Sequence, residues 1–171
     1  FTAKQIADTR KTSAALLCLS ENSRDRADAT VGKALKAGAK GPRPAFIYFH
    51  GGGHVFGDLD THDVIARNLC GGADVVVVAV DYRLAPEHKF PAAVDDAWAA
   101  YAWAREHGAT LGIDPSRLAV GGDSAGGNLA AVIAIMARDA GHVNIKLQVL
   151  IYPVTDYSLG SDSYIRFGEG Y

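Results

Sequence analysis

The sequence predicts an α/β fold built on a doubly wound, mostly parallel sheet, and three observations carry this prediction. Short apolar runs alternate with longer helical segments between Pro44 and Pro153. One of these runs, at residues 74–80, is almost entirely valine, as expected of a strand that is buried on both faces. Both glycine-rich motifs of the chain directly follow such runs. In this fold class, the loops at the carboxyl ends of the strands form the functional site.

The individual elements are predicted from apolar runs and from the prolines and glycines that bound them. We expect strands at residues 45–49, 74–80, 118–121 and 145–152, the last of them buried and stopped by Pro153. We expect helices at residues 2–19, 61–70, 91–107 and 125–140, with glycines directly after the last three. Residues 20–44 give no clear pattern, and the Gly- and Ser-rich residues 157–171 show no core pattern.

Length, composition and charge exclude several classes of protein. The 171 residues suit one compact domain, of which 49% are hydrophobic and 21% charged, as in an ordinary globular protein. The formal net charge of −2 gives no electrostatic reason to expect a nucleic acid or an anionic membrane as partner. Cys18 and Cys70 form no C-x-x-C pair, so neither a disulfide framework nor a thiolate metal site is expected.

The sequence also predicts where the protein resides. Its longest apolar run is too short to cross a bilayer, and no signal peptide is visible. We therefore expect a cytoplasmic protein without stable membrane insertion. Because the chain begins with Phe1 rather than Met, we expect the natural N-terminus to lie upstream.

Residues 122–126, with the sequence Gly-Asp-Ser-Ala-Gly, form the first motif that carries chemistry. They join a predicted strand to a predicted helix, the context in which a G-x-S-x-G motif holds a nucleophilic serine on a sharp turn. Gly122 and Gly126 meet the need for small residues where neighbouring backbone comes close. The helix after Ser124 directs its N–H groups and its dipole at the reaction centre. The alternatives are an incidental serine in a glycine-rich turn or a phosphate-binding loop, but the Walker lysine is absent.

The second motif is His50-Gly51-Gly52-Gly53, which follows the first predicted strand. Acyl transfer builds negative charge on the carbonyl oxygen, and backbone N–H groups must already point at it. We expect the N–H groups of Gly52, Gly53 and Ala125 to be these donors. His50 lies at the root of the loop and precedes the serine, so we expect it to hydrogen-bond the loop rather than to act in catalysis.

Together these motifs resemble those of the hormone-sensitive-lipase-like family of α/β-hydrolases, also called bacterial family IV esterases. The resemblance runs from about Pro44 to Asp156 and includes residues 46–53, 57–62, 81–88, 90–93 and 122–127. It implies a serine carboxylic-ester hydrolase that acts on small, short-chain acyl esters through an acyl-enzyme and needs no cofactor. It also implies that residues 1–25 are a helical segment of a cap and that residues 26–171 are the N-terminal part of the catalytic domain.

His54 departs from this resemblance, because the family usually has an aromatic residue there, at the border of the substrate pocket. We therefore expect His54 to contact substrate and to influence which acyl group is accepted.

The remainder of a catalytic triad is not evident in the sequence. In this fold an acid and then a histidine follow the serine, yet the only later histidine is His142, at the far end of the next helix. The later acids are Asp139, Asp156, Asp162 and Glu169. The resemblance places both groups beyond residue 171, so the expected partner is the C-terminal part of the same protein. Two alternatives stay open: a non-catalytic small-molecule-binding protein of this fold, like some hormone receptors, and an amidase or formamidase.

Other polar residues are better explained by structure than by chemistry. Asp95 and Asp96 share a predicted helix but face no other evident acid, so we expect structural carboxylates. Asp58, His62 and Asp63 do not have the spacing of a known metal site, and no metal is expected.

Aromatic residues and one arginine are assigned to packing. Trp98, Tyr101 and Trp103 are expected to pack the helix that carries them against its neighbours. Arg83 is expected to anchor the loop after its strand through an ion pair, close to His50.

Overall fold

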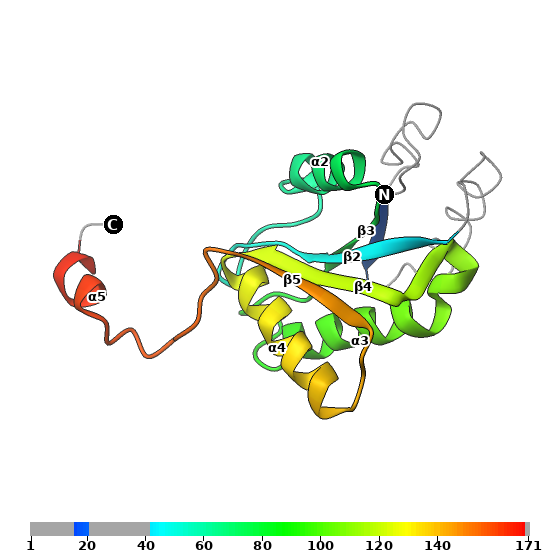
Figure 1. Cartoon of the computed structure of the whole chain (residues 1–171). Coiled ribbons are helices and arrows are strands. Elements are labelled where there is room, and N and C mark those ends of the chain that lie inside the picture. Colours follow the sequence, from blue (N-terminus) through cyan, green and yellow to red (C-terminus); the bar gives the residue numbers. More distant parts are fainter. Residues whose placement is uncertain (1–15, 21–41, 170–171) are drawn as a thin grey trace.

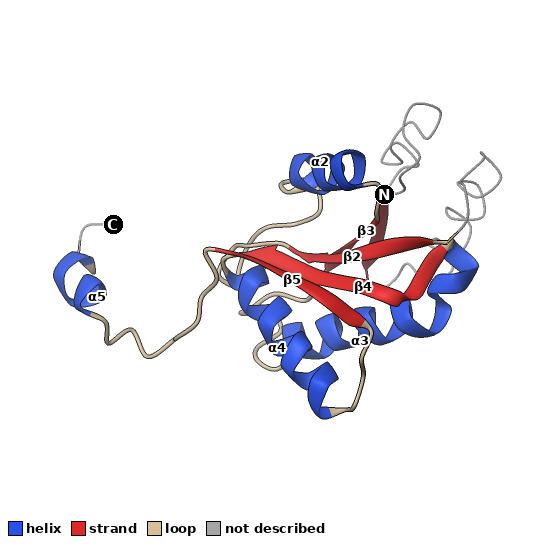
Figure 2. Ribbon diagram, in the orientation of Figure 1, coloured by secondary structure: helices blue, strands red, loops and turns tan. Residues whose placement is uncertain are grey.

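The structure is a computed structural model that describes residues 16–20 and 42–169. In these residues a single parallel sheet has the strand order β1-β3-β2-β4-β5. Its strands are β1 (Leu16–Ser20), β2 (Arg43–Phe49), β3 (Val76–Asp81), β4 (Ile113–Asp123) and β5 (Ile145–Ile151). Helix α2 (Asp63–Ala73) covers one face, and α3 (Ala92–His107) and α4 (Ala125–Asp139) cover the other (Figures 1 and 2). The predicted doubly wound α/β fold is confirmed.

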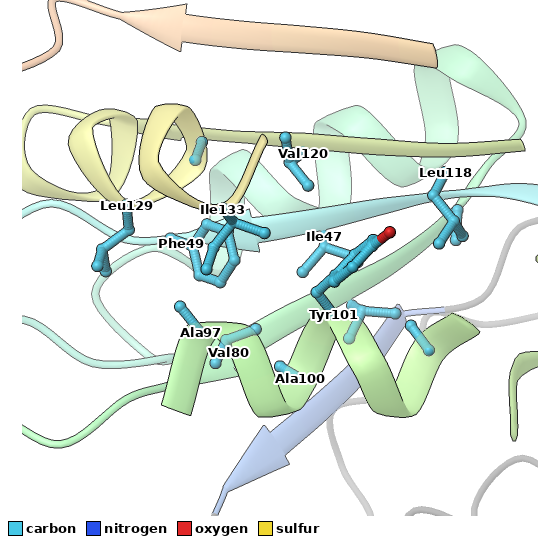
Figure 3. Packing of buried hydrophobic residues seen from close by; sticks show 14 of the residues in the cluster. Ile47, Phe49, Val80, Ala97, Ala100, Tyr101, Leu118, Val120, Leu129 and Ile133 are labelled. Atoms are coloured by element: carbon cyan, nitrogen blue, oxygen red, sulfur yellow. The ribbon is translucent and has the colours of Figure 1, made fainter. Parts of the chain in front are cut away.

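The core is divided by the sheet into two layers because successive side chains of a strand point to opposite faces. Ile47 and Phe49 of β2 pack with the helices α3 and α4, whereas Phe46 and Tyr48 pack on the side of α2. Figure 3 shows the larger layer, in which Ile133 of α4 lies close to the side chains of β2. Burying such side chains contributes about 1.5–3 kcal/mol each, so the central strands form a rigid base for the loops that follow them.

The helix that precedes β3 differs from its prediction at both ends. It begins at Asp63 rather than at residue 61, and it continues through Gly71 and Gly72 to Ala73. The two glycines do not stop it, because the residue in left-handed conformation that ends the helix is Asp74, with φ 51°. All four predicted strands are present as β2, β3, β4 and β5. Strand β4 is longer than predicted because residues 113–117 extend it.

Two predictions at the edges of the sheet are wrong. Residues 16–20 form β1, paired with β3, instead of the end of a helix over residues 2–19. The run Leu-Leu-Cys-Leu is short and apolar, and such a run does not distinguish a strand from a helix. The rest of that predicted helix lies outside the described residues. The division into a cap segment, 1–25, and a catalytic domain, 26–171, stays a prediction, although residues 16–20 belong to the sheet.

The sequence predicts a buried strand at residues 145–152, but the side chains of β5 are largely exposed. Leu147 is 56% exposed and Leu150 is 39% exposed, because β5 is the edge strand and pairs only with β4 among the described residues. After β5 the chain extends away from the sheet to α5 (Asp162–Phe167), which has no buried residue and stands apart in Figure 1. None of the helices in the described part is long and apolar enough to span a membrane.

Candidate active site

Ser124 stands on the sharp turn between β4 and α4. Its φ of 52° and ψ of −115° lie outside the regions that residues with side chains normally adopt. The turn is fixed from two sides: the Ser124 N–H donates to the Ile151 carbonyl at 2.9 Å, and the Ser124 carbonyl accepts from the N–H groups of Asn128 and Val154 at 3.1 and 3.2 Å. The strained conformation is therefore maintained by β5, by the first turn of α4 and by the segment after β5.

The glycines of this turn are explained by close contact with the end of β2. A Cβ on Gly126 would collide with the carbonyl oxygen of Phe49 and would lie 2.5 Å from that of His50. A Cβ on Gly122 would also collide with the Phe49 carbonyl oxygen and would lie 2.5 Å from the carbonyl carbon of Gly126. All of these obstacles are backbone atoms, which cannot rotate away as side chains can. The serine turn and the end of β2 thus pack backbone to backbone.

The glycine loop begins at this same end of β2. Gly52 and Gly53 have φ values of 119° and 62°, and the Gly52 carbonyl accepts two hydrogen bonds of 3.0 Å, from the N–H groups of Val55 and Phe56. Among the described residues, the N–H groups of Gly52, Gly53 and Ala125 have no hydrogen-bond acceptor. The loop therefore offers unpaired donors next to the serine turn, as an oxyanion hole requires.

His50 is fixed at the root of this loop. Its Nδ1 lies 2.7 Å from the Gly51 carbonyl oxygen and must carry the proton, so the neutral ring has its lone pair on Nε2. The ring stacks on Tyr82 at 4.3 Å, and the Tyr82 hydroxyl donates to the His50 carbonyl oxygen at 2.7 Å. His50 is 2% exposed, and burial lowers its pKa. These contacts provide the structural role that the sequence predicted.

The buried neutral His50 predicts that acid destabilises the fold. In the unfolded chain this histidine titrates near about pH 6.5, and in the folded chain at a lower pH. Below about pH 6.5 the unfolded chain therefore binds more protons, and the free energy of unfolding falls as the pH falls further. Urea unfolding between about pH 8 and 5 should show a shallower pH dependence for His50→Asn than for the wild type. Equal slopes would contradict this; His54, whose pKa burial also lowers, leaves a residual slope in both.

Asp123 is a site residue that the sequence reasoning missed. Asp123 is 7% exposed, and its carboxylate accepts hydrogen bonds from the Tyr48 hydroxyl at 2.6 Å and from the Gly51 N–H at 3.1 Å. His62 Nε2 lies 3.6 Å from its other oxygen. Burial and this carboxylate raise the pKa of Tyr48, which keeps the phenol protonated as a donor. A charged residue between a buried strand and a nucleophile was the signal that could have revealed Asp123.

His54 lies directly after the loop glycines, in a left-handed conformation with φ 64°. Its Nε2 is 2.7 Å from the Tyr157 hydroxyl, and its carbonyl accepts from the Ala85 N–H at 2.8 Å. Burial lowers its pKa. These contacts place His54 between the glycine loop and the segment after β5, and its role in binding substrate stays a prediction.

His142 lies away from Ser124, as predicted. It follows α4, whose 15 residues separate it from the serine by roughly 20 Å at 1.5 Å per residue. Its ring stacks on Trp98 with centroids 5.8 Å apart, and Arg105 Nη1 lies 2.7 Å from its Nε2. His142 therefore packs against α3 and does not contact the serine.

The remaining polar residues have structural partners. Arg83 pairs with Asp96 through contacts of 2.7–3.0 Å, which confirms the predicted ion pair and the structural reading of Asp96. Asp58 accepts from the Thr61 N–H at 2.8 Å and so caps a turn. Asp63 pairs with Arg67 at 2.6 Å. The predicted proximity of Arg83 to His50 stays a prediction.

The aromatic residues of α3 pack as predicted. Tyr101 is fully buried in the larger core layer, between the sheet and the helices α3 and α4 (Figure 3). Trp98 and Trp103 are partly buried and pack against that layer. On the opposite face, a cavity of about 10 Å³ is lined by Tyr48, His50 and His62 among others, without Ser124. It has room for one water molecule at most and is not a substrate pocket.

Comparison with known proteins adds to this geometry. The family described as alpha/beta hydrolase fold matches residues 46–171. Esterase LipI of Mycobacterium tuberculosis is 60% identical over 120 residues, which are 69% of this chain and 38% of that protein. Ethyl acetate hydrolase of Pseudomonas putida is 51% identical over 128 residues, which are 74% of this chain and 40% of that protein.

A solved structure that is similar to this chain is also an esterase. The hyperthermophilic esterase from the archaeon Pyrobaculum calidifontis is 59% identical with a TM-score of 0.65, over 67% of this chain and 38% of that chain. The present chain thus spans about two fifths of the length of these relatives. The match to the family covers well over half of the chain and includes both glycine motifs. The resemblance seen in the sequence is confirmed, and the chain belongs to the α/β-hydrolase family.

Proposed function

We propose that the protein containing this chain is a serine carboxylic-ester hydrolase that acts on short-chain acyl esters through an acyl-enzyme. The observation that carries the proposal is the strained turn that holds Ser124 beside the unpaired N–H groups of Gly52, Gly53 and Ala125. Relatives named as esterases support ester hydrolysis. A relative named for ethyl acetate, whose acyl group has two carbon atoms, supports a short acyl chain.

The reaction would use these groups in sequence. The Ser124 Oγ attacks the ester carbonyl carbon while a histidine outside the described residues removes the hydroxyl proton. The negative charge moves to the carbonyl oxygen, where the three N–H groups bind it. The C–O bond to the alcohol then breaks, the alcohol leaves with the proton, and water hydrolyses the acyl-serine.

The geometry supports charge stabilisation in particular. Ala125 is the first residue of α4, so its N–H lies at the positive end of the helix dipole. Donors that are already oriented need no reorganisation during the reaction, and each contributes on the order of 3 kcal/mol to lowering the barrier. The hydrogen bonds that fix the loop and the turn supply this orientation.

The proposal is tested by turnover together with covalent trapping. The protein that contains this chain should hydrolyse p-nitrophenyl acetate and butyrate faster than the matched anilides. An alkyl fluorophosphonate should modify the peptide that carries Ser124, as detected by mass spectrometry, and Ser124→Ala should remove both turnover and labelling. Faster anilide hydrolysis would point to an amidase, and ester binding without turnover or labelling would point to a binding protein; either result would overturn the proposal.

A further inference from the structure

We propose that Asp123 is a positioning residue that holds the glycine loop in register with the nucleophile. This inference rests on the proposed function and extends it to a residue that does not touch the substrate. Asp123 directly precedes Ser124, and Gly51 directly precedes the donor Gly52. A bond between Asp123 and Gly51 therefore links the two halves of the site one residue away from each.

The link is a hydrogen bond to a buried charge. The Gly51 N–H donates to Asp123 Oδ1 at 3.1 Å, and the Tyr48 hydroxyl donates to the same oxygen at 2.6 Å. Hydrogen bonds to a carboxylate are stronger than those between neutral groups. Because Tyr48 belongs to β2, the carboxylate is held by the strand from which the loop emerges, and the loop is held in turn by the carboxylate.

Shape supports the same link. A Cβ on Gly51 would collide with Asp123 Oδ2 and would lie 3.1 Å from the Asp123 carbonyl oxygen. Gly51 does not have a positive φ, unlike Gly52 and Gly53. The glycine at position 51 is therefore explained by the closeness of the Asp123 carboxylate rather than by an unusual backbone conformation.

Two substitutions separate positioning from charge. Asparagine keeps an oxygen at Oδ1, so it can still accept from Gly51 and Tyr48, whereas alanine cannot. In the protein that contains this chain, Asp123→Ala should lower kcat for p-nitrophenyl butyrate by about 10- to 100-fold, since small misplacements of reacting groups cost about this much. KM should change less than about threefold, because the loop donors act mainly in the transition state. Asp123→Asn should restore most of kcat.

An independent readout reports on the loop itself. Affinity for an alkylboronic acid, which forms a tetrahedral adduct with the serine, should fall in Asp123→Ala by the same factor as kcat. The matched control is Asp114→Ala, which removes a partly exposed carboxylate from the other end of β4 and should change neither value. Folded Asp123→Ala with wild-type kcat, or a loss that Asp123→Asn does not restore, would overturn the inference.

A double-mutant cycle tests the contact without relying on turnover. Gly51→Ala should lower the midpoint of thermal unfolding more in the wild type than in Asp123→Ala, where the colliding carboxylate is absent. Additive shifts would overturn the contact. If the wild type hydrolyses no ester, the proposed function fails, and the thermal cycle still decides whether Asp123 holds the loop.

Discussion

Replacing Gly126 with alanine is expected to destabilise the fold by about 3 kcal/mol or more and to abolish activity. The new Cβ would collide with the Phe49 carbonyl oxygen and approach that of His50. Phe49 is fully buried and paired on both sides by β3 and β4, so β2 cannot move aside. Overpacking of this kind costs about 1–3 kcal/mol when side chains can adjust, and more when they cannot.

The measurement is urea unfolding followed by circular dichroism, with esterase activity measured in parallel. Gly71→Ala is the matched control, because Gly71 also lies in a helix but the added Cβ would have no atom within 4 Å apart from its chain neighbours and the backbone of its own helix. Alanine there should stabilise the protein by about 0.5–1 kcal/mol, as it restricts the unfolded chain and favours the helix. If Gly126→Ala were as stable as Gly71→Ala, the backbone-to-backbone packing of the serine turn would be wrong.

The sequence predicts the elements around the serine turn well because two signals coincide there. The apolar run that ends at Gly121 and the helical run after Ser124 have lengths and boundaries that admit one interpretation. The glycines between them report the close approach of β2, which the structure confirms at Gly122 and Gly126. The sharp turn between strand and helix and the close packing against β2 both require glycine at positions 122 and 126. A single sequence therefore suffices to identify the turn.

The predictions that are wrong lie where the local sequence pattern is not accompanied by a sign of tertiary packing. Residues 16–19 are apolar, but nothing within them indicates that β3 is available as a pairing partner. The glycines at positions 71 and 72 resemble a helix end, yet space around them is open and the helix continues. Strand β5 has the composition of a buried strand, whereas its exposure depends on which strand lies beside it. Which strands pair depends on contacts between residues that are far apart in the sequence, and a local sequence pattern does not reveal these contacts.

Asp123 was missed for a related reason. The position between Gly122 and Ser124 varies freely in the general G-x-S-x-G pattern, so the motif itself gives the residue no role. Its role comes from Tyr48 and Gly51, which are 75 and 72 residues earlier in the chain. Only the pairing of β2 with β4 brings these groups together, and the register Phe49 with Gly122 sets their distance.

Gly52→Ala and Gly53→Ala should differ sharply, although the two glycines are neighbours in one loop. Gly52 has φ 119°, a region almost restricted to glycine, and its Cβ would collide with the Phe56 carbonyl oxygen. Gly53 has φ 62°, which alanine adopts at a cost of about 1–2 kcal/mol, and its Cβ would meet only Val55 Cγ2, at 3.8 Å.

In the proposed esterase, Gly52→Ala should therefore move the loop donors and lower kcat by about 100-fold or more, the effect of losing an oxyanion donor. Gly53→Ala should keep kcat within about tenfold of the wild type and lower stability only modestly. Both variants should be compared by kcat, KM and urea unfolding with p-nitrophenyl butyrate as substrate. Equal losses of kcat in two folded variants would show that the constraint at Gly52 does not control the donors, because the φ of 119° and the collision with Phe56 are what distinguish Gly52 from Gly53.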